Sequence, residues 1–324
     1  LKIQQAFDLV RDELKMVEEK FRENISSDVY LITKIGEYIL RSGGKRFRPL
    51  MLLLSSRVAG YKGERHIPLA VMVEFIHTAT LLHDDVVDNA KIRRGAESAN
   101  LVWGNGPSIL VGDYLLSRAF ELAVNDGDMN ILKTLSRTTT RMAEGEMLQI
   151  LRRSNIHTTE EEHLKIVAGK TAVLFSASCR IPAILASLPP EKEKALETYG
   201  MEVGTAFQLM DDCLDYTSRD EVIGKARGSD IREGKITMPL IAAYGKSDAP
   251  EKKLIEAVVK SDGITDSDME EIFAIIKKRK GIEYTLGFAA KRVENAKKQL
   301  DIFEPTPERA ALSAAADFVI ERIS

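Results

Sequence analysis

Apolar residues recur at helical spacing along almost the whole chain, whereas the alternating pattern of half-buried strands is hard to find. Prolines stand where helices are expected to begin, as in Arg48-Pro49, Ile67-Pro68 and Gly106-Pro107. The pattern therefore predicts an all-α protein. The helices that we expect first along the chain span residues 3–23, 27–41, 48–60, 67–88, 107–125, 128–153, 159–187 and 191–216.

A charged loop with several glycines follows the last of these helices, over residues 217–235, and further helices are expected beyond it. A loop of this length in a structured protein usually has a function. The more polar residues 247–280 predict a peripheral helical region. No linker marks a boundary, and 324 residues with 44% hydrophobic side chains can form one large core. We therefore expect a single domain over residues 1–324.

The overall charge and composition exclude some classes of function. With 46 basic and 49 acidic residues, the chain lacks the broad basic field that nucleic-acid binding requires. No stretch reaches the roughly 18 uncharged apolar residues of a membrane span, and residues 1–23 lack the apolar core of a signal peptide. Two cysteines, Cys179 and Cys213, fit a reducing compartment better than a disulfide scaffold. We expect a cytoplasmic protein.

An acidic pattern occurs twice, each time at the end of a long apolar run: Asp84-Asp85-Val86-Val87-Asp88 and Asp211-Asp212-Cys213-Leu214-Asp215. A carboxylate in an apolar setting must become neutral or find a partner. On a helix, the first and last aspartates of each motif share one face. One or two carboxylate oxygens, with coordination positions left for water and phosphate, are the ligand set that magnesium prefers. Solvated helix ends are the alternative for one motif alone, and the second copy argues against it.

Basic residues gather near these motifs in short clusters. The segment Gly43–Pro49 combines two glycines with Lys45, Arg46 and Arg48, and Arg93-Arg94 follows the first motif by five residues. Guanidinium groups bind phosphate oxygens in a bidentate way. An anionic substrate that bridges the metal and the arginines is therefore predicted, with a salt bridge to the aspartates as the alternative.

Three further polar residues are candidates for the same site. Lys170 stands in a mostly apolar helix, where its charge is costly unless it meets an anion. Gln208 precedes Asp211 by three positions, and His77 precedes Asp84 by seven, so each shares a helix face with a motif. A satisfied core histidine is an equally good interpretation of His77.

Taken in order and at their spacing, these strings resemble the trans-isoprenyl diphosphate synthases, the polyprenyl synthetase family. The resemblance covers most of the chain. The strings that carry it are Gly-Gly-Lys-Arg-Phe-Arg-Pro at 43–49, Leu-Leu-His-Asp-Asp-Val-Val-Asp-Asn at 81–89, Arg-Arg-Gly at 93–95, Gly-Asp-Tyr-Leu-Leu at 112–116, Gly-Lys-Thr-Ala at 169–172, Phe-Gln-Leu-Met-Asp-Asp-Cys-Leu-Asp-Tyr at 207–216, Gly-Lys at 224–225 and Glu-Gly-Lys-Ile-Thr-Met-Pro-Leu at 233–240.

The resemblance implies a helical bundle around a deep central cavity, a homodimer, and three magnesium ions that hold an allylic diphosphate between the two motifs. It implies a prenyltransferase that condenses isopentenyl diphosphate head to tail with farnesyl or geranylgeranyl diphosphate. The loop 217–235 would be a lid.

Motif by motif, the resemblance also implies roles for single residues. The magnesium ligands, direct or through a second layer, would be Asp84, Asp85, Asp88, Asp211, Asp212 and Asp215. The allylic diphosphate would be held by Arg93, Lys170, Lys225 and Lys235. The isopentenyl diphosphate would be held by Lys45, Arg48, His77 and Arg94. The developing carbocation would be lined by Thr171 and Gln208.

The helix before the first motif is expected to set product length. In the resembled family, a bulky aromatic four or five positions before the motif stops chain growth, and here those positions are Thr80 and Ala79. With Ile76 one turn further along, an open tunnel is predicted, whose floor would be Leu135 or Met142. We expect a long all-trans product, octaprenyl by preference, of the kind that supplies quinone side chains. Its release implies a peripheral contact with a membrane.

Three other functions remain as alternatives. A geranylgeranyl diphosphate synthase would share every motif and differ only in the tunnel floor. A non-catalytic subunit of a heteromeric synthase has typically lost some of the aspartates or basic residues, and none is lost here. A terpene cyclase usually carries a different second motif, so the twin acidic motifs disfavour it.

Overall fold

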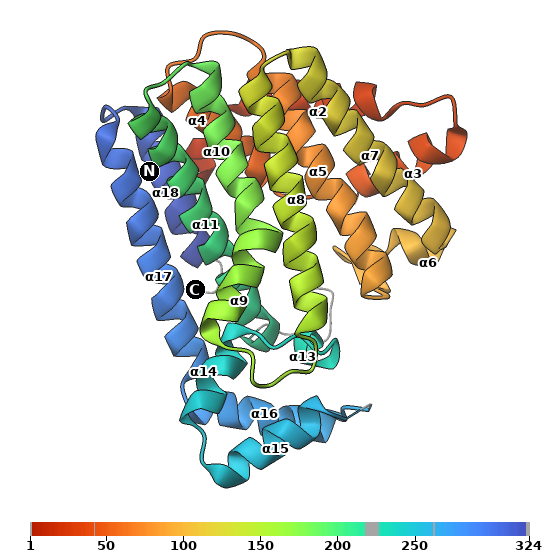
Figure 1. Ribbon diagram of the computed structural model, residues 1–324. Coiled ribbons are helices and arrows are strands. Elements are labelled where there is room, and N and C mark those ends of the chain that lie inside the picture. Colours follow the sequence, from red (N-terminus) through yellow and green to blue (C-terminus); the bar gives the residue numbers. More distant parts are fainter. Residues whose placement is uncertain (1, 42, 218–226, 262, 322–324) are drawn as a thin grey trace. The chain divides into compact units, whose positions relative to one another are not determined.

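Within the residues that it describes, the computed structural model is almost entirely helical, as predicted, apart from one very short pair of strands (Figure 1). It describes residues 2–41, 43–217, 227–261 and 263–321. In the part of the chain that is described, no helix is long and apolar enough to cross a bilayer.

The chain divides into two compact units, which are treated separately below. The single domain expected from the sequence stays a prediction. The first unit comprises Leu1–Thr139, Leu174–Gly200 and Lys297–Ala315. The second unit comprises Thr140–Val173, Met201–Ala296 and Ala316–Ser324.

The first unit is organised around α5 (His66–Val87), the helix that leads into the first acidic motif. Residues on nearly every side of α5 are buried, because its sequence is apolar all round and neighbouring helices cover it. It packs against α2 (Arg11–Ile25), α4 (Phe47–Val58) and α7 (Asn105–Asp126) (Figure 1). The other elements that lie wholly or mostly in this unit are α1 (Ile3–Leu9), α3 (Tyr30–Arg41), α6 (Ala99–Trp103), α10 (Val173–Leu185) and the 3₁₀ turn η2 (Leu300–Ile302).

A two-stranded hairpin, not expected from the sequence, follows α5 in the first unit. Strand β1 (Ile92–Arg93) pairs antiparallel with β2 (Ala96–Glu97). The connecting residues Arg94 and Gly95 both have left-handed φ angles, 53° and 78°, as in the tight turns that match the twist of a hairpin. Gly95 adopts this conformation without a steric penalty, whereas it is uncommon for Arg94. The turn brings both arginines back beside α5.

The second unit contains the part of α11 (Pro190–Thr217) that carries the second acidic motif. Its hydrophobic core includes Tyr216, Leu240, Ile255 and Ile272. Residues 247–280, expected to be helical, supply two of its helices, and both pack against α14. The remaining elements with residues in this unit are α8 (Met129–Leu151), α9 (Glu160–Val167), the π-helix η1 (Ala168–Ala172), α13 (Ser229–Arg232), α14 (Met238–Lys246), α15 (Ala249–Val259), α16 (Asp266–Lys278), α17 (Gly281–Gln299) and α18 (Pro307–Glu321).

Two of the predicted helices were wrong in detail. The helix expected over residues 3–23 is interrupted at Val10, whose backbone has φ −120° and ψ 21°. Val10 is completely buried there, and burial outweighs local helical preference. The helix expected over residues 159–187 widens into the π-helix η1 and ends at Leu185.

Candidate active site

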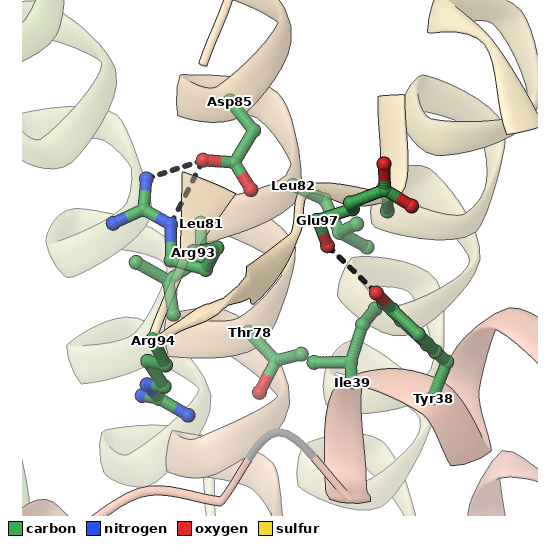
Figure 2. Close-up of a pocket in the computed structure, with 10 residues that line it drawn as sticks. Tyr38, Ile39, Thr78, Leu81, Leu82, Asp85, Arg93, Arg94 and Glu97 are labelled. Atoms are coloured by element: carbon green, nitrogen blue, oxygen red, sulfur yellow. Dashed lines mark hydrogen bonds and ion pairs between the residues drawn. The ribbon is translucent and has the colours of Figure 1, made fainter. Parts of the chain in front are cut away.

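The first acidic motif lies where α5 ends, and its central aspartate is paired with an arginine of the hairpin. Asp85 is only 3% exposed. Its Oδ1 accepts a hydrogen bond from Nε of Arg93 at 2.8 Å and another from Nη2, and Figure 2 shows the guanidinium pointing to the carboxylate. Burial lowers the pKa of Arg93, but its bond to Asp85 and the charges of Asp84 and Asp88 outweigh burial and raise that pKa. The salt bridge considered as an alternative is therefore present.

A small pocket lies next to this pair within the first unit. Figure 2 shows Asp85 and Arg93 on one side of it and Tyr38 on the other, where the tyrosine hydroxyl donates to the backbone carbonyl of Glu97 at 2.8 Å. The cavity volume of about 20 Å³ has room for about one water molecule. This pocket is too small for a diphosphate or a prenyl chain.

Four arginines act electrostatically on His77, the candidate that precedes the first motif by two helical turns. Burial lowers the pKa of His77 well below its usual value, and the charges of Arg48, Arg94, Arg93 and Arg46 lower it further. So many like charges around one imidazole keep it neutral and favour an anion nearby. The charges of Arg48 and Arg94 thus act on His77, and the binding of one substrate by these three residues stays a prediction.

The glycine pair at 43–44 makes room for Arg94. Its Nη1 donates a hydrogen bond to the carbonyl of Gly43, and a Cβ on Gly44 would lie 2.7 Å from the same nitrogen. Arg94 is exposed as a whole residue, but its guanidinium end is crowded. Loss of water and the charges of Arg46 and Arg93 accordingly lower the pKa of Arg94, while Glu74 opposes them.

Arg46 was not a site candidate, and the structure gives it a supporting role. It forms ion pairs with Glu18 and with Glu74, the latter at 2.7 Å, and Glu74 is 3% exposed in the middle of α5. This ties the 43–49 segment to α5. Arg48 stacks over the ring of Phe175 with its guanidinium carbon 4.4 Å from the ring centre, and Lys45 is exposed. An acidic residue in an apolar helix, Glu74, was the sequence signal for this pairing.

The central aspartate of the second motif accepts hydrogen bonds from uncharged or weakly basic groups. Asp212 is 1% exposed, and Oδ2 lies 2.8 Å from Nε2 of His163 on α9. Its Oδ1 accepts from the amide of Gln208 at 3.1 Å, and the Gln208 carbonyl accepts from the hydroxyl of Thr171 at 2.8 Å. The structure thus brings Thr171, Gln208 and Asp212 together, and their part in catalysis stays a prediction. His163 was missed.

The last aspartate of the second motif is held by the start of α13. Asp215 accepts hydrogen bonds from the backbone and hydroxyl of Ser229, at 3.1 and 2.8 Å, and from the backbone of Asp230 at 3.2 Å. Burial and the charge of Asp215 raise the pKa of Asp230 well above its usual value, although Lys235 opposes them. Lys235 itself pairs with Glu233 at 2.6 Å. Asp230 adds a carboxyl group that the sequence analysis did not select.

Lys170 lies in the π-helix η1, where two helices of the second unit approach closely. A Cβ on Gly169 would lie 3.0 Å from Cα of Gly145, and a Cβ on Gly145 would lie 2.5 Å from the backbone nitrogen of Lys170. The Lys170 ammonium pairs with Glu146 and donates to the side-chain carbonyl of Gln149 at 2.8 Å. Single π-turns inside helices often occur at functional sites. The predicted Lys225 lies outside the described residues, as do the other residues of the predicted lid between 218 and 226.

The expected product-length residues lie on α5. Ile76 and Ala79 are each 1% exposed, and Thr80 is partly buried. The Thr80 hydroxyl donates to the backbone carbonyl of His77 at 2.8 Å, so it needs no other polar partner. Their role in setting product length stays a prediction.

The donor chemistry of the motifs fits a hard cation. The carboxylates supply oxygen ligands only, which is the donor chemistry that magnesium prefers. Across the described ranges, no group of three or more histidine, cysteine, aspartate or glutamate side chains could hold a metal ion. Magnesium is usually bound by only one or two carboxylates, together with substrate phosphate oxygens and water.

The two cysteines play no evident part in such chemistry. Burial raises the pKa of both Cys179 and Cys213 to about 12. Both thiols are free and buried. They are therefore packing residues.

Comparison with known proteins gives matches over nearly the full chain. The sequence profile of the family described as polyprenyl synthetase matches residues 29–276. Octaprenyl diphosphate synthase of Escherichia coli (strain K12) is 37% identical over 322 residues, which are 99% of this chain and 99% of that protein. The all-trans-nonaprenyl-diphosphate synthase (geranyl-diphosphate specific) of Rhodobacter capsulatus is 38% identical over 326 residues, covering 98% of this chain and 99% of the relative.

A solved structure gives the same result for the fold. The crystal structure of polyprenyl synthase from Caulobacter crescentus CB15, complexed with calcium and isoprenyl diphosphate, matches with a TM-score of 0.96 and 39% sequence identity. The match covers 100% of this chain and 98% of that one.

Proposed function

This chain belongs to the polyprenyl synthetase family, and on that premise we propose that it is a prenyltransferase that makes a long-chain all-trans polyprenyl diphosphate. It condenses isopentenyl diphosphate head to tail with an allylic diphosphate, farnesyl or geranylgeranyl diphosphate. The full-length similarity to an octaprenyl and a nonaprenyl diphosphate synthase supports the long product.

The observation that supports this proposal most strongly is that acidic and basic groups gather beside one helix of the first unit. The acidic motif closes α5, and burial together with the charges of four arginines lowers the pKa of His77 two turns before it. A substrate with a diphosphate and a bound metal ion carries both the negative and the positive charge that such a surface complements.

Magnesium is the cofactor that we propose for both motifs, with three ions per active site as the resemblance implies. Asp84 and Asp88 supply ligands in the first motif, and Asp211 supplies one in the second. Asp85, Asp212 and Asp215 act as ligands or as supports for their neighbours. When bound, the metal neutralises the departing diphosphate and so promotes ionisation of the allylic carbon–oxygen bond. The crystallised relative from Caulobacter crescentus, complexed with calcium and isoprenyl diphosphate, supports this assignment.

The basic residues divide between the two substrates. Arg93, Lys170, Lys225 and Lys235 bind the allylic diphosphate. Arg93, Lys170 and Lys235 hold acidic partners here, Asp85, Glu146 and Glu233. These pairs loosen or are shared when the more highly charged diphosphate binds.

Isopentenyl diphosphate binds at Lys45, Arg48, His77 and Arg94. The neutral His77 donates a hydrogen bond to an anion without adding a fixed charge. Thr171 and Gln208 present oxygen atoms to the positive charge that develops on the allylic fragment.

The lid proposed for residues 217–235 excludes water while that cation exists, since water would capture it. Product length is set on α5, where Ala79 and Thr80 leave room for several added isoprene units above Ile76.

A homodimer is the proposed assembly. Large apolar side chains are exposed on α6 and α7, with Leu101 at 52%, Val102 at 42% and Leu110 at 67%. A partner subunit that covered such side chains would remove apolar surface from water. We also propose that the protein is cytoplasmic and touches a membrane peripherally to release its apolar product.

The purified chain, incubated with magnesium, isopentenyl diphosphate and farnesyl diphosphate, tests the proposal. The extracted prenyl alcohols, sized after phosphatase treatment, should be centred on eight isoprene units. A chelator should abolish them. Products that stop at four units would establish a geranylgeranyl synthase instead, and no product beyond the primer would contradict catalysis by this chain alone.

A further inference from the structure

The buried hydrogen bonds around Asp212 distinguish this aspartate from the others in its motif. Its carboxylate has a side-chain exposure of 2%, and that of His163 is 5%. Each carboxylate oxygen has its own donor, Nε2 of His163 at 2.8 Å and the amide of Gln208 at 3.1 Å. An ionised carboxylate only accepts hydrogen bonds, so Nε2 of His163 carries the proton that lies between them.

The four hydrogen-bonded side chains around Asp212 come from three elements of the second unit. His163 stands on α9, Gln208 and Asp212 stand one turn apart on α11, and Thr171 of η1 donates to Gln208 at 2.8 Å. Neighbouring members therefore fix one another's orientation. Every polar group in a buried network needs a hydrogen-bond partner, because an unpaired group loses its favourable free energy of hydration without compensation.

We propose that His163 is a positioning residue, which together with Gln208 fixes Asp212 as the buried anchor of the second acidic motif. The metal ion is then held by the neighbouring aspartates, whose orientation depends on this anchor. This inference rests on the proposed function, because it takes the second motif to be a magnesium–diphosphate site. It assigns a role to a residue outside every motif that the sequence analysis selected.

The geometry requires a donor at one particular point, the position of Nε2. A glutamine at position 163 extends its amide nitrogen about as far as Nε2, whereas an asparagine reaches only the region of Nδ1. Leucine has a similar volume to histidine and no donor. If His163 only fills space, all three replacements should behave alike; if it positions Asp212, glutamine should rescue the function and asparagine should not.

The test compares H163Q, H163N and H163L with the wild-type protein. H157Q is the matched control, because His157 is exposed and stacks only against Tyr244. Binding of Mn²⁺, an EPR-visible substitute for Mg²⁺, is titrated in the presence of inorganic pyrophosphate. Prenyl transfer is measured in parallel, with kcat and KM resolved for each substrate.

We expect H163L and H163N to weaken Mn²⁺ binding by about 10- to 100-fold, the usual effect of removing a group that orients a metal ligand. H163Q and H157Q should bind Mn²⁺ within a few-fold of the wild type. KM for isopentenyl diphosphate should change little in all variants, while kcat falls in H163L and H163N. If H163L fails to fold, the comparison of H163Q with H163N still decides the question.

Equal Mn²⁺ affinity in H163Q and H163N, or wild-type affinity in folded H163L, would overturn the inference. Failure of the proposed function has a different signature. In that case the wild type makes no prenyl product, whatever the Mn²⁺ titrations show.

Discussion

The two acidic motifs have the same spacing of aspartates at the end of an apolar helical run, but their central aspartates are held by different chemistry. Asp85 is paired with Arg93, whose guanidinium is charged at every physiological pH. Asp212 is held by His163 and by the uncharged amide of Gln208. The same five-residue pattern is therefore held by a permanently charged side chain in the first motif and by a histidine and an amide in the second.

The difference shows how negative charge is balanced in each unit. In the first, an arginine from the adjacent hairpin neutralises the central carboxylate. In the second, a further carboxyl, Asp230, lies near Asp215, and burial together with that neighbouring charge raises its pKa. The protein therefore gives the central aspartate of the first motif a paired counter-charge, and gives that of the second motif hydrogen-bond donors on other side chains.

The largest expected effect comes from removing the leading aspartate of either motif. D84N and D211N should each lower kcat by at least about 100-fold, because a group that stabilises charge developing in the transition state is lost. D12N is the matched control, since Asp12 is 91% exposed and pairs only with Lys15. Steady-state product formation measures the effect. Near-normal turnover in one of the two site variants would show that its motif is not needed for catalysis.

The support of the first motif can be removed separately through Arg93. R93M should lower the free energy of unfolding by about 3 kcal/mol, since it leaves the buried Asp85 without its counter-charge. R94M should cost less than about 1 kcal/mol, because Arg94 is exposed and its bond is to a backbone carbonyl. Urea unfolding measures both. Equal losses would show that the Asp85–Arg93 pair is not the specific support described here.

Of the two helices that carry the acidic motifs, only the one before the first motif is expected to control product length. A79Y should shift the products to fewer isoprene units, because a ring at this position would occupy the space that the growing chain needs. T80S, which keeps a small side chain, should leave the length unchanged. Chromatography of the dephosphorylated products measures both. A79Y products of wild-type length would show that α5 does not control the length of the product.

The smallest effect concerns the pH dependence of stability through His77. Because its pKa in the folded protein lies below the usual 6.5, the unfolded chain takes up the proton first as the pH falls. The free energy of unfolding should therefore be highest above about pH 6.5 and decrease below it, by at most about 1.4 kcal/mol per pH unit.

The H77Q variant isolates this contribution. Glutamine stays neutral, so H77Q should lose less stability than the wild type between pH 7.5 and pH 5.5. Urea titrations at the two pH values give the difference. An identical loss in both proteins would mean that His77 keeps an ordinary pKa.

Local patterns were enough to predict most of the fold. The helix expected over residues 67–88 is α5 (His66–Val87), and the one expected over residues 107–125 is α7 (Asn105–Asp126). Their long apolar periodicity leaves little ambiguity. The π-helix at 168–172 was not predictable in this way, because it accompanies the close approach of Gly169 to Gly145, which is distant in sequence. The hairpin was missed because its turn is Arg94-Gly95, without the usual Asn-Gly signal.

The same distinction applies to the candidate site. Residues inside or next to a motif, such as Asp212 and Gln208, could be selected from spacing along one helix. His163 and Arg46 could not, because their partners Asp212 and Glu74 are 49 and 28 residues away in the sequence. Supports of this kind depend on tertiary packing, which a periodic pattern does not specify.

The central claim is that binding of a magnesium diphosphate requires the leading aspartate of each motif. Calorimetric titration with a non-ionisable thiolo analogue of farnesyl diphosphate tests it directly, on wild type, D84N and D211N, with and without Mg²⁺. We predict tight binding only for the wild type with Mg²⁺, and a loss of at least about 10-fold in each variant. Metal-independent binding, or wild-type affinity in either variant, would contradict the account.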